Sequence, residues 1–369
     1  MEQVVKLTTA EALAVKQMWS EIFFEDSQTF TDYYFAEKMK DNIGYGVTSD
    51  NALRAMLFLT PYTGRIYAPD REGRLFQDVP LYYIVGVGTQ KEYRHRGYMD
   101  RLLRHCLHDM YESGRPFTFL MPADPAIYTP YQFRYIYDRP VFHVVWRGEN
   151  RGSVMEAGEE EALARFAGEQ LEARYHFYLK RDASYYRRQK KESLAQGGDI
   201  YLWKRQGEIA GFYLYAKENG KEEIQEAIVS KELAAQDALQ ISDQTRPVIM
   251  ARITNAAAML SLMRLKGQQG QTVTVTLKLS DPLIRENNGT FLWTVGEKES
   301  TIALLEKNSK AEVSVRIDAL TEFIFGRKSS EECFDDMELD CQRNGPQGGV
   351  YERLSKIRTL SRSFINEIV

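Results

Sequence analysis

The stretch VGVGTQKEYRHRGYMD, residues 85–100, decides how the first part of this sequence folds. It continues the almost wholly apolar run LYYIVGVGT, residues 81–89, which is typical of a strand buried on both faces. It leads into residues 96–112, where leucine, cysteine and methionine recur at helical spacing until Ser113 and Gly114 end the pattern. The sequence therefore predicts a buried strand, a polar loop and an amphipathic helix in direct succession.

The junction of this loop and helix has the properties of a diphosphate site. The first N–H groups of a helix have no acceptor inside the helix, and the helix dipole adds partial positive charge there. Gly97 lets the backbone approach a ligand closely, and Arg94 and Arg96 add full charges. The pattern is neither a Walker loop nor a dinucleotide fingerprint, because the required lysine and further glycines are absent. An ordinary strand–loop–helix with surface arginines is the alternative.

Residues Arg94 to Met99, RHRGYM, resemble the acyl-CoA pyrophosphate loop Arg/Gln-x-x-Gly-x-Gly/Ala of the GNAT superfamily of N-acyltransferases. Met99 departs from the pattern at its last position, and Lys91 replaces the proline of the family's preceding Pro-Glu-Tyr-Arg. The resemblance implies that strand backbone pairs with the pantetheine of acetyl-CoA and that loop amides bind its diphosphate. The implied cofactor-binding residues are Val87, Gly88, Thr89, Arg94, His95, Arg96, Gly97, Tyr98, Met99 and Asp100.

A second motif follows the buried strand predicted at residues 117–122. The stretch AIYTPYQF, residues 126–133, resembles the family's Tyr-x-x-x-Gly-Phe, whose tyrosine protonates the departing CoA thiolate. Tyr128 and Phe133 match this pattern, whereas Gln132 replaces the glycine. A phenol suits the role, because a pKa of about 10 keeps it protonated at neutral pH. The alternative for Tyr128 is a packing aromatic.

Composition divides the chain at a charged, glycine-containing stretch around residues 147–158 and again near Pro247. The predicted domains are residues 1–147, residues 148–247, which repeat the order of helices and strands without the loop motif, and residues 248–369. Within the last two domains we also predict helices over residues 159–178 and residues 357–365.

This arrangement resembles the enhanced intracellular survival (Eis) family of acetyltransferases, whose third domain is similar to sterol carrier proteins. The segments MARI (residues 250–253), SDP (280–282) and NNGTF (287–291) look like signatures of that domain. The resemblance implies an α/β and α+β fold class: tandem GNAT folds, with mixed central sheets flanked by helices, followed by a sterol-carrier-like α+β domain. It also implies that residues 1–147 hold the acetyl-CoA site, that residues 148–247 bind no CoA, and that the chain forms a homo-oligomer, a hexamer.

Three further residues are candidates for the reaction. The resemblance to the Eis family implies that the carboxylate of Val369 is the general base, and the alternative is a frayed terminus. Glu25 and Asp26 lie among aromatic residues between the first two predicted helices, which wall the acceptor pocket in GNAT enzymes. They are candidate substrate-binding residues for a cationic amine, and the alternative is a surface loop over a core.

Composition excludes several classes of protein. The 369 residues are 43% hydrophobic and carry 48 basic against 52 acidic side chains, so we expect a folded protein with no nucleic-acid partner. There is no signal-peptide pattern and no apolar run long enough to span a bilayer, so we expect a cytoplasmic protein without a membrane partner. Cys106, Cys333 and Cys341 fit neither a disulfide framework nor a metal site, and we expect no metal.

These observations together predict an enzyme, an acetyl-CoA-dependent N-acetyltransferase. It would move an acetyl group from acetyl-CoA, its cosubstrate, to a primary amine by direct attack. The sequence leaves the small-molecule or peptide acceptor open among aminoglycosides, polyamines and lysine-like amines. The alternative is a non-catalytic regulatory protein that binds CoA or a lipid.

Overall fold

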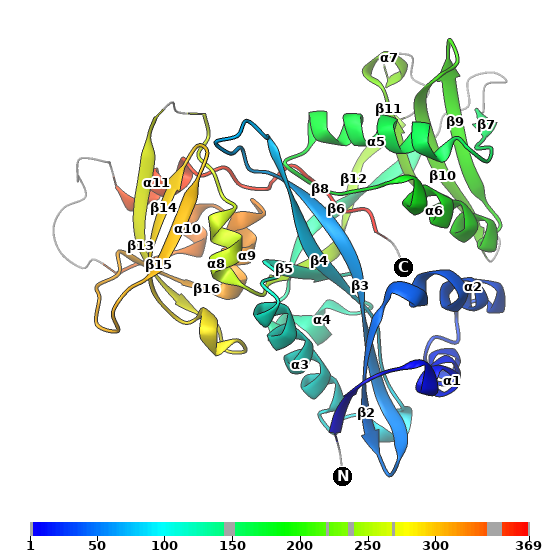
Figure 1. Cartoon of the computed structure of the whole chain (residues 1–369), viewed down its shortest axis with the longest axis horizontal. Helices are drawn as coiled ribbons and strands as arrows, with labels where there is room; N and C mark the ends of the chain where they lie inside the picture. Colours follow the sequence, from blue (N-terminus) through cyan, green and yellow to red (C-terminus); the bar gives the residue numbers. More distant parts are fainter. Residues whose placement is uncertain are drawn as a thin grey trace.

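The computed structural model describes residues 3–143, 152–218, 221–234, 240–267, 270–337 and 349–367. Within these residues the strands form three sheets, of nine, four and five strands. Each sheet, with its helices, makes one lobe of the molecule in Figure 1, and we call these lobes the N-terminal, middle and C-terminal units.

The N-terminal unit is built around β4 (Phe76–Thr89), the strand predicted from the apolar run. β4 is antiparallel to β3 and parallel to β5, and the strand order is β1-β2-β3-β4-β5-β12-β6. The strands are β1 (Gln3–Lys6), β2 (Ile43–Ser49), β3 (Ala52–Tyr67), β5 (Phe117–Leu120), β6 (Arg134–His143) and β12 (Gln240–Ile253). Two short strands, β8 (Phe177–Leu179) and β18 (Ser363–Phe364), extend this sheet from the free edge of β3.

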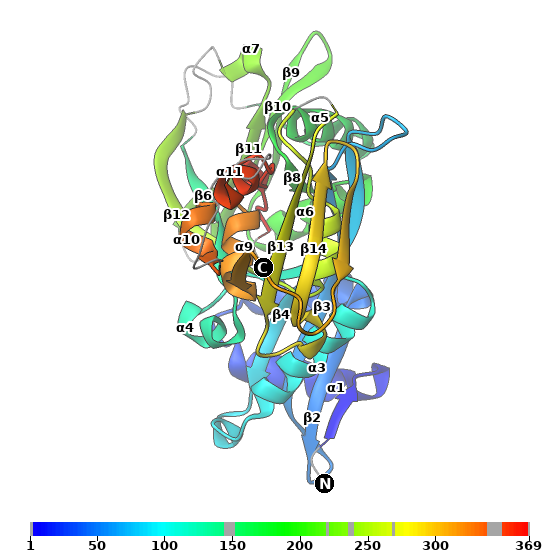
Figure 2. The same cartoon turned by 90° about the vertical axis from the view of Figure 1, so that its left-hand side faces the viewer.

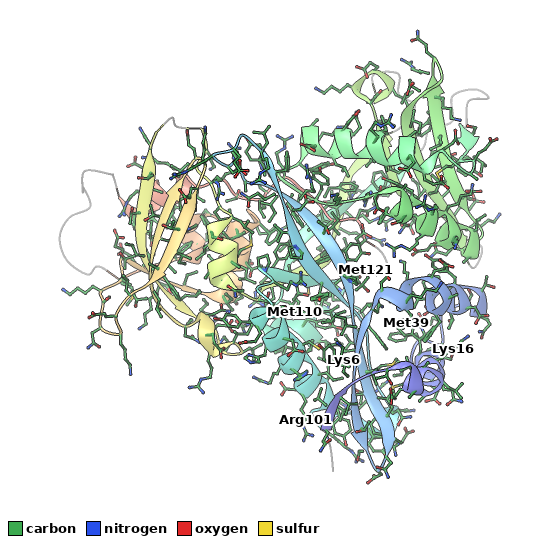
Figure 3. All side chains as sticks on the ribbon, in the orientation of Figure 1. Lys6, Lys16, Met39, Arg101, Met110 and Met121 are labelled. Atoms are coloured by element: carbon green, nitrogen blue, oxygen red, sulfur yellow. The ribbon has the colours of Figure 1, made fainter. Side chains whose placement is uncertain are left out.

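Helices cover both faces of this sheet. On one face lie η1 (Thr9–Glu11), α1 (Ala12–Ile22), α2 (Gln28–Tyr33), η2 (Tyr34–Lys38) and η3 (Met39–Asp41), with Trp19 packed against Phe58 of β3. On the other face lies α3 (Tyr98–Glu112), whose apolar stripe is buried against β3 and β4. Figure 3 shows the two layers, with Met39 on the side of α1 and Met110 on the side of α3.

The middle unit packs two helices, α5 (Glu160–Arg174) and α6 (Ala183–Ala195), on the sheet β11-β10-β9-β7. Its strands are β7 (Ser153–Val154), β9 (Asp199–Arg205), β10 (Glu208–Glu218) and β11 (Lys221–Val229), and α7 (Lys231–Ala234) follows. The helix predicted over residues 159–178 ends at Arg174, because residues 177–179 instead pair with β3 as β8.

The C-terminal unit sets the sheet β15-β14-β13-β16-β17 against short helices. The strands are β13 (Thr272–Ser280), β14 (Gly289–Gly296), β15 (Ser300–Leu304), β16 (Val313–Arg316) and β17 (Asp335–Asp336). The helices are α8 (Ala256–Ser261), η6 (Arg285–Asn287), α9 (Ile317–Ile324), α10 (Ser330–Cys333) and α11 (Val350–Ser355), and Figure 2 looks onto this unit. Trp293 of β14 is fully buried in this unit and donates its indole N–H to the Leu260 carbonyl at 3.1 Å.

The predicted fold class is confirmed: mixed sheets flanked by helices are followed by an α+β unit. The predicted boundary between residues 247 and 248 lies inside β12, which is hydrogen-bonded between β5 and β6 in the N-terminal sheet. The change of composition near Pro247 therefore marks a buried strand that returns to the first sheet. The boundary between residues 147 and 148 lies outside the described residues.

The helix predicted over residues 357–365 does not form, because these residues run extended from the C-terminal unit back to the N-terminal sheet. Ser363 and Phe364 pair in parallel with Phe177 and Tyr178 of β8. Ile365 is fully buried there, so the apolar residues of this segment are explained by docking rather than by helix packing.

Candidate active site

The centre of the N-terminal sheet opens into a fork between β4 and β5. The two strands are paired only at Tyr82–Thr118 and Tyr83–Phe119, and β5 ends at Leu120 while β4 continues to Thr89. Beyond the last pair, Gly86 adopts φ +61°, and the β3–β4 register shifts at this point as in a bulge. Beyond the fork, the edge of β4 that faces β5 has no strand partner among the described residues.

The backbone of β4 presents hydrogen-bonding groups to this fork. The amide of Gln90 donates to the Arg54 carbonyl of β3 at 3.0 Å. Because backbone groups alternate in direction along a strand, those of Thr89 and Val87 point away from β3 and into the fork. Gly88 lies between them and is buried, and a Cβ there would come within 2.7 Å of Ile22 on α1.

The loop after β4 gathers backbone amides at the N-terminus of α3. After η4 (Lys91–Tyr93), His95 and Gly97 take left-handed conformations with φ of 63° and 79°. The amides of His95, Arg96 and Gly97 have no hydrogen-bond acceptor within the described part of the chain. Nothing lies within 4 Å of a Cβ placed on Gly97, so the space in front of this loop is open. Successive unpaired N–H groups at a helix N-terminus form an anion-binding concavity.

The side chains around the loop keep this concavity positive. Arg94 and Arg96 are exposed, and each donates to a carbonyl of the preceding residues, those of Thr89 at 3.3 Å and Glu92 at 3.1 Å. The carboxylate of Asp100 accepts from Arg104 with both oxygens, at 2.9 Å, and this ion pair offsets its charge at the helix start. Tyr98 is buried below the loop and Met99 packs on the same core. All ten predicted cofactor-binding residues therefore lie at the fork or the loop.

Tyr128 ends α4 (Pro125–Tyr128), a single turn capped by the carboxylate of Asp124. Its ring is 8% exposed and meets Phe133 edge-on at a centroid distance of 6.0 Å. Tyr128 shares a core cluster with Tyr98, so the two sequence motifs come together in space. Its hydroxyl makes no hydrogen bond to a described residue, and burial raises the pKa of Tyr128 to about 12.

Gln132 stands where the family pattern has glycine, and the backbone conformation at this position explains why glycine is preferred there. After η5 (Thr129–Tyr131), Gln132 adopts φ +66°, a left-handed conformation that costs a side-chain-bearing residue about 1 kcal/mol. Its side-chain amide donates to the Pro130 carbonyl at 3.3 Å, and its oxygen accepts from Arg316 of β16 at 3.2 Å. These bonds help to hold the strained conformation.

A buried polar network lies between the N-terminal and middle units, and none of its members was predicted from the sequence. The carboxylate of Glu367 accepts from Tyr62 at 3.0 Å, from Tyr185 at 3.1 Å and from Arg181 at 3.2 Å. Arg181 also pairs with Glu226, so two buried carboxylates share one guanidinium. Burial, assisted by repulsion from Glu226, raises the pKa of Glu367. The members come from three distant parts of the chain, around residue 62, residues 181–226 and residue 367, and no local pattern marks them.

A cavity of 320 Å³ borders this network at the free edge of β3. Pairing with β2 ends at Leu59 and pairing with β8 begins at Gly64, so residues 60–63 lack a strand partner on this edge in the described chain. The lining residues come from β3, β4, α6 and the segments beside them: Lys38, Asp41, Thr60, Pro61, Tyr62, Thr63, Pro80, Leu81, Tyr82, Arg115, Lys180, Asp182, Tyr185, Arg188 and Gln189. Tyr62 and Tyr185 line this cavity and also bind Glu367, which places a carboxylate directly behind its wall.

The cavity contains four basic side chains, and three of them are neutralised locally. These three lie within 3.0 Å of a carboxylate, in the pairs Lys38–Glu192, Lys180–Asp78 and Arg188–Asp41. Arg115 has no carboxylate partner among the described residues, and its guanidinium lies 4.7 Å from the Tyr82 ring. The Asp182 carboxylate also lines the cavity and accepts bonds only from Ser184 and the Tyr185 amide, so the wall offers one positive and one negative group without an ion-pair partner in the described chain.

The other predicted site residues lie elsewhere. Glu25 is exposed and Asp26 half-buried in the turn between α1 and α2, and neither lines the cavity. The Asp26 carboxylate accepts from the Trp19 indole at 3.0 Å, and burial raises its pKa. Val369 lies outside the described residues. The roles of Glu25, Asp26 and Val369 stay predictions.

Across the described ranges, no group of three or more His, Cys, Asp or Glu side chains is placed to hold a metal ion. Cys106 and Cys333 are buried free thiols, and Cys341 lies outside those ranges. No described helix combines the length and apolarity needed to cross a bilayer.

Two family models match the sequence. Residues 3–136 match an acetyltransferase (GNAT) domain and residues 256–360 match a sterol carrier protein domain. The N-terminal unit therefore carries a GNAT acetyltransferase domain, and the C-terminal unit is a sterol carrier protein domain. No curated protein has a significant sequence match to the chain.

Solved structures share the whole architecture at low sequence identity. A probable N-acyltransferase from Enterococcus faecalis is 16% identical with a TM-score of 0.74, covering 99% of this chain and 97% of the other. A GCN5-related N-acetyltransferase from Anabaena variabilis is 14% identical with a TM-score of 0.73 and 97% of each chain covered. Eis1 from Mycobacterium abscessus is 12% identical with a TM-score of 0.68 over the full length of both chains. The chain thus shares the three-unit fold of these proteins.

Proposed function

We propose that this protein is an acetyl-CoA-dependent N-acetyltransferase of the Eis family that acetylates a primary amine. The observation that carries the proposal is the fork between β4 and β5, which opens beside the unpaired amides of residues 95–97 and the buried Tyr128. Such a site offers backbone groups for a pantetheine arm, a concavity for a diphosphate and a proton donor at one place.

In the proposed reaction the acetyl-CoA thioester supplies the acyl group. The amides of residues 95–100 bind its diphosphate, and the backbone groups of Val87 and Thr89 hold the pantetheine amides. The amine nitrogen attacks the thioester carbonyl carbon, and the C–S bond breaks as Tyr128 gives its proton to the sulfur. Backbone N–H at the end of β4, near Thr89, stabilises the oxyanion.

The proton released by the amine goes to a base, and we propose the terminal carboxylate of Val369 for this role. The support is the docked C-terminal segment, since Glu367, two residues earlier in the sequence, is bound to Tyr62 in the cavity wall. Two residues span at most about 7 Å, so a carboxylate at position 369 would have that wall within reach. Appending a few residues after Val369 should lower turnover at pH 7, with partial recovery at higher pH as more amine is neutral. Full activity at pH 7 would contradict the role.

The cavity at the edge of β3 is the proposed acceptor site, and the charged groups in its wall predict which amines react best. A polycation would leave the Arg115 guanidinium unpaired, whereas an amine that also carries a carboxylate would pair with Arg115 and keep its ammonium group for Asp182. We therefore expect lysine-like amino acids and peptides with a free carboxylate to react better than aminoglycosides or polyamines. Glu25 and Asp26 remain proposed contacts for the approaching amine from the α1–α2 turn.

Release of free thiol from acetyl-CoA, measured against a panel of these amines, tests the proposed activity. We expect amine-dependent release with at least one acceptor class. If acetyl-CoA binds but no amine raises thiol release above hydrolysis, a regulatory CoA-binding protein is favoured instead. Binding of a lipid by the sterol carrier domain, whose core contains the completely buried Trp293, is the other alternative.

The proposed oligomeric state rests only on the proposed membership of the Eis family. We propose a hexamer, so light scattering at micromolar concentration should give six times the chain mass of 42.7 kDa. A mass of one chain under those conditions would refute it.

A further inference from the structure

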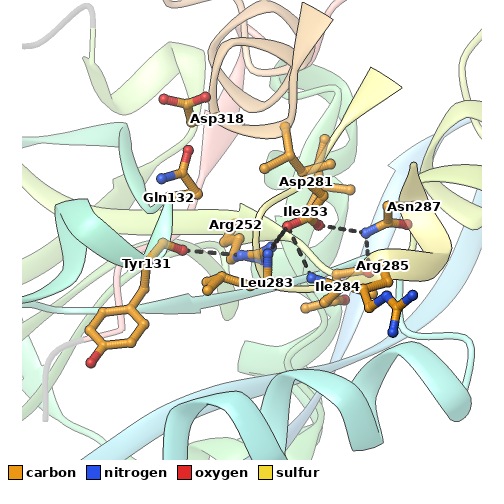
Figure 4. Close-up of polar contacts among 12 residues, drawn as sticks. Tyr131, Gln132, Arg252, Ile253, Asp281, Leu283, Ile284, Arg285, Asn287 and Asp318 are labelled. Carbon is orange, nitrogen blue, oxygen red and sulfur yellow. Dashed lines mark hydrogen bonds and ion pairs between the residues drawn. The ribbon is translucent and has the colours of Figure 1, made fainter. Parts of the chain in front are cut away.

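The turn that follows Tyr128 is held by arginines from other parts of the fold. Arg134 of β6 donates to the carbonyls of Thr129 at 3.3 Å and Phe133 at 2.8 Å. Arg252 of β12 donates its Nε–H to the carbonyl of Tyr131 at 3.1 Å, a contact drawn in Figure 4. Three carbonyls of one five-residue turn are thus bound by two guanidinium groups.

Both arginines are fixed in turn by carboxylates of the sterol carrier domain. Arg252 pairs with Asp281 at 2.5 Å, and both side chains are fully buried. Asp281 also accepts from two backbone amides after β13 and from Asn287 at 2.8 Å, as Figure 4 shows. Arg134 pairs with Asp318, at the first turn of α9.

The same domain reaches the strained residue of the turn. Arg316 donates to the side-chain oxygen of Gln132 at 3.2 Å and to Asp318 at 3.1 Å. Asp318 therefore orients two arginines that both contact the turn, Arg134 from the GNAT sheet and Arg316 from its own domain.

Tyr128 depends on this turn for its position. Its hydroxyl has no partner among the described residues, and the four-residue helix that carries it is too short to be stable alone. The Asp124 cap fixes the backbone on the N-terminal side of Tyr128. The position of Tyr128 therefore also depends on the turn on its C-terminal side. A proton donor displaced by about 1 Å costs on the order of a hundredfold in rate.

We propose that the sterol carrier domain is a clamp for the general acid, in which Asp281 and Asp318 are positioning residues that act on Tyr128 through Arg252, Arg134 and Arg316. This inference rests on the proposed function, because it gives Tyr128 the role of general acid. It assigns the third domain a part in acyl transfer that requires no lipid ligand.

Asp318→Asn tests the clamp, with Asp138→Asn as its matched control. Both changes remove the charge from a carboxylate in an arginine pair between β6 and the C-terminal unit, but the Asp138–Arg327 pair does not touch the turn. We expect Asp318→Asn to lower kcat by about tenfold to a hundredfold with the Kd for acetyl-CoA unchanged, and Asp138→Asn to leave kcat as it is. Combined with Tyr128→Phe, Asp318→Asn should lower kcat no further, because the proton donor is already lost. An equal loss with and without Tyr128→Phe would overturn the proposal.

Hydrogen exchange separates this inference from the proposed function. The amides of Gln132 and Phe133 are bonded within the turn, at 3.0 and 3.3 Å. Asp318→Asn should speed their exchange at least tenfold, and Asp138→Asn should not, even if the wild-type protein acetylates no amine at all. Should Asp318→Asn fail to fold, Arg316→Gln provides the same measurement from a side chain that is 65% exposed. Unchanged exchange and unchanged kcat in a folded variant would refute the clamp.

Discussion

The burial of Tyr128 determines the pH range over which its hydroxyl stays protonated. Removal from water disfavours the phenolate, so burial alone raises its pKa to about 12. A group with a raised pKa stays protonated up to that pH, so Tyr128 keeps the proton that the proposed mechanism gives to the thiolate at every pH below about 12. The rate should therefore rise with pH as the amine loses its proton, with no alkaline decline from Tyr128 below about pH 12.

Tyr128→Phe removes this proton and keeps the ring that packs on Phe133. We expect kcat to fall by about 10²–10⁴, as for a lost general acid, and the Kd for acetyl-CoA to stay within about twofold. Thiol release and calorimetry measure the two quantities. Tyr135→Phe, on the neighbouring strand, is the control and should behave as wild type. Wild-type turnover in Tyr128→Phe would remove the assigned role.

Gly97→Asp tests the loop as the diphosphate site. The substitution adds a negative side chain in the open space before the amides and strains the backbone at φ +79°. Affinity for CoA should fall on the order of a hundredfold, about 3 kcal/mol. Gly73→Asp is matched, because Gly73 has φ +88° and equally open surroundings in the β3–β4 hairpin. Calorimetry should give the control full affinity, and undiminished affinity in Gly97→Asp would place the diphosphate elsewhere.

At the scale of elements, the sequence predicts what is encoded within one segment. The strand, loop and helix of residues 81–112 are encoded in this way. The apolar periodicity, the loop glycine and the arginines that predict them all lie within that segment. The pairing of β8 with β18 is not local, and the helices predicted over residues 159–178 and 357–365 cover most of both strands. Strands of two or three residues carry no readable period, and their pairing depends on segments 186 positions apart. For the same reason the sequence does not predict the contacts of Glu367 with Arg181 and Tyr62. These contacts form because β18 pairs with β8.

The docked C-terminal segment should respond to pH through Glu367. Its pKa is raised above the ordinary 4.5, so the folded state binds this proton more tightly than the unfolded chain. The stability contributed by protonation is complete below pH 4.5 and is lost as pH rises through the raised pKa. Glu367→Gln cannot ionise, so its melting temperature relative to wild type should increase as pH rises from 4.5 to 8. A difference that is constant with pH would show that Glu367 keeps its ordinary pKa in the fold.

At the scale of the whole molecule, the GNAT and sterol carrier domains share one core. A single cluster of buried residues joins Leu81, Phe119 and Ile249 of the N-terminal sheet to Leu320 and Phe325 beside the third sheet. The two domains match separate family models and yet have this cluster in common, beside further clusters that α1 and α3 form with the N-terminal sheet. Their shared core and the clamp on the Tyr128 turn have the same structural origin, since β12 leads from the first sheet directly into the third unit.

This shared core predicts that the two domains unfold together. Phe325 packs edge-on against Phe117 at 5.2 Å and against Phe177 at 6.2 Å, so Phe325→Ala leaves a cavity between the domains and should cost about 3–5 kcal/mol. Calorimetry should show one transition for both domains that Phe325→Ala moves to lower temperature. CoA at a hundred times its Kd should raise that same transition, by about 2.7 kcal/mol of stability, although its proposed site lies in the GNAT domain alone. Two transitions, of which CoA raises one and Phe325→Ala lowers the other, would show that the domains are energetically independent.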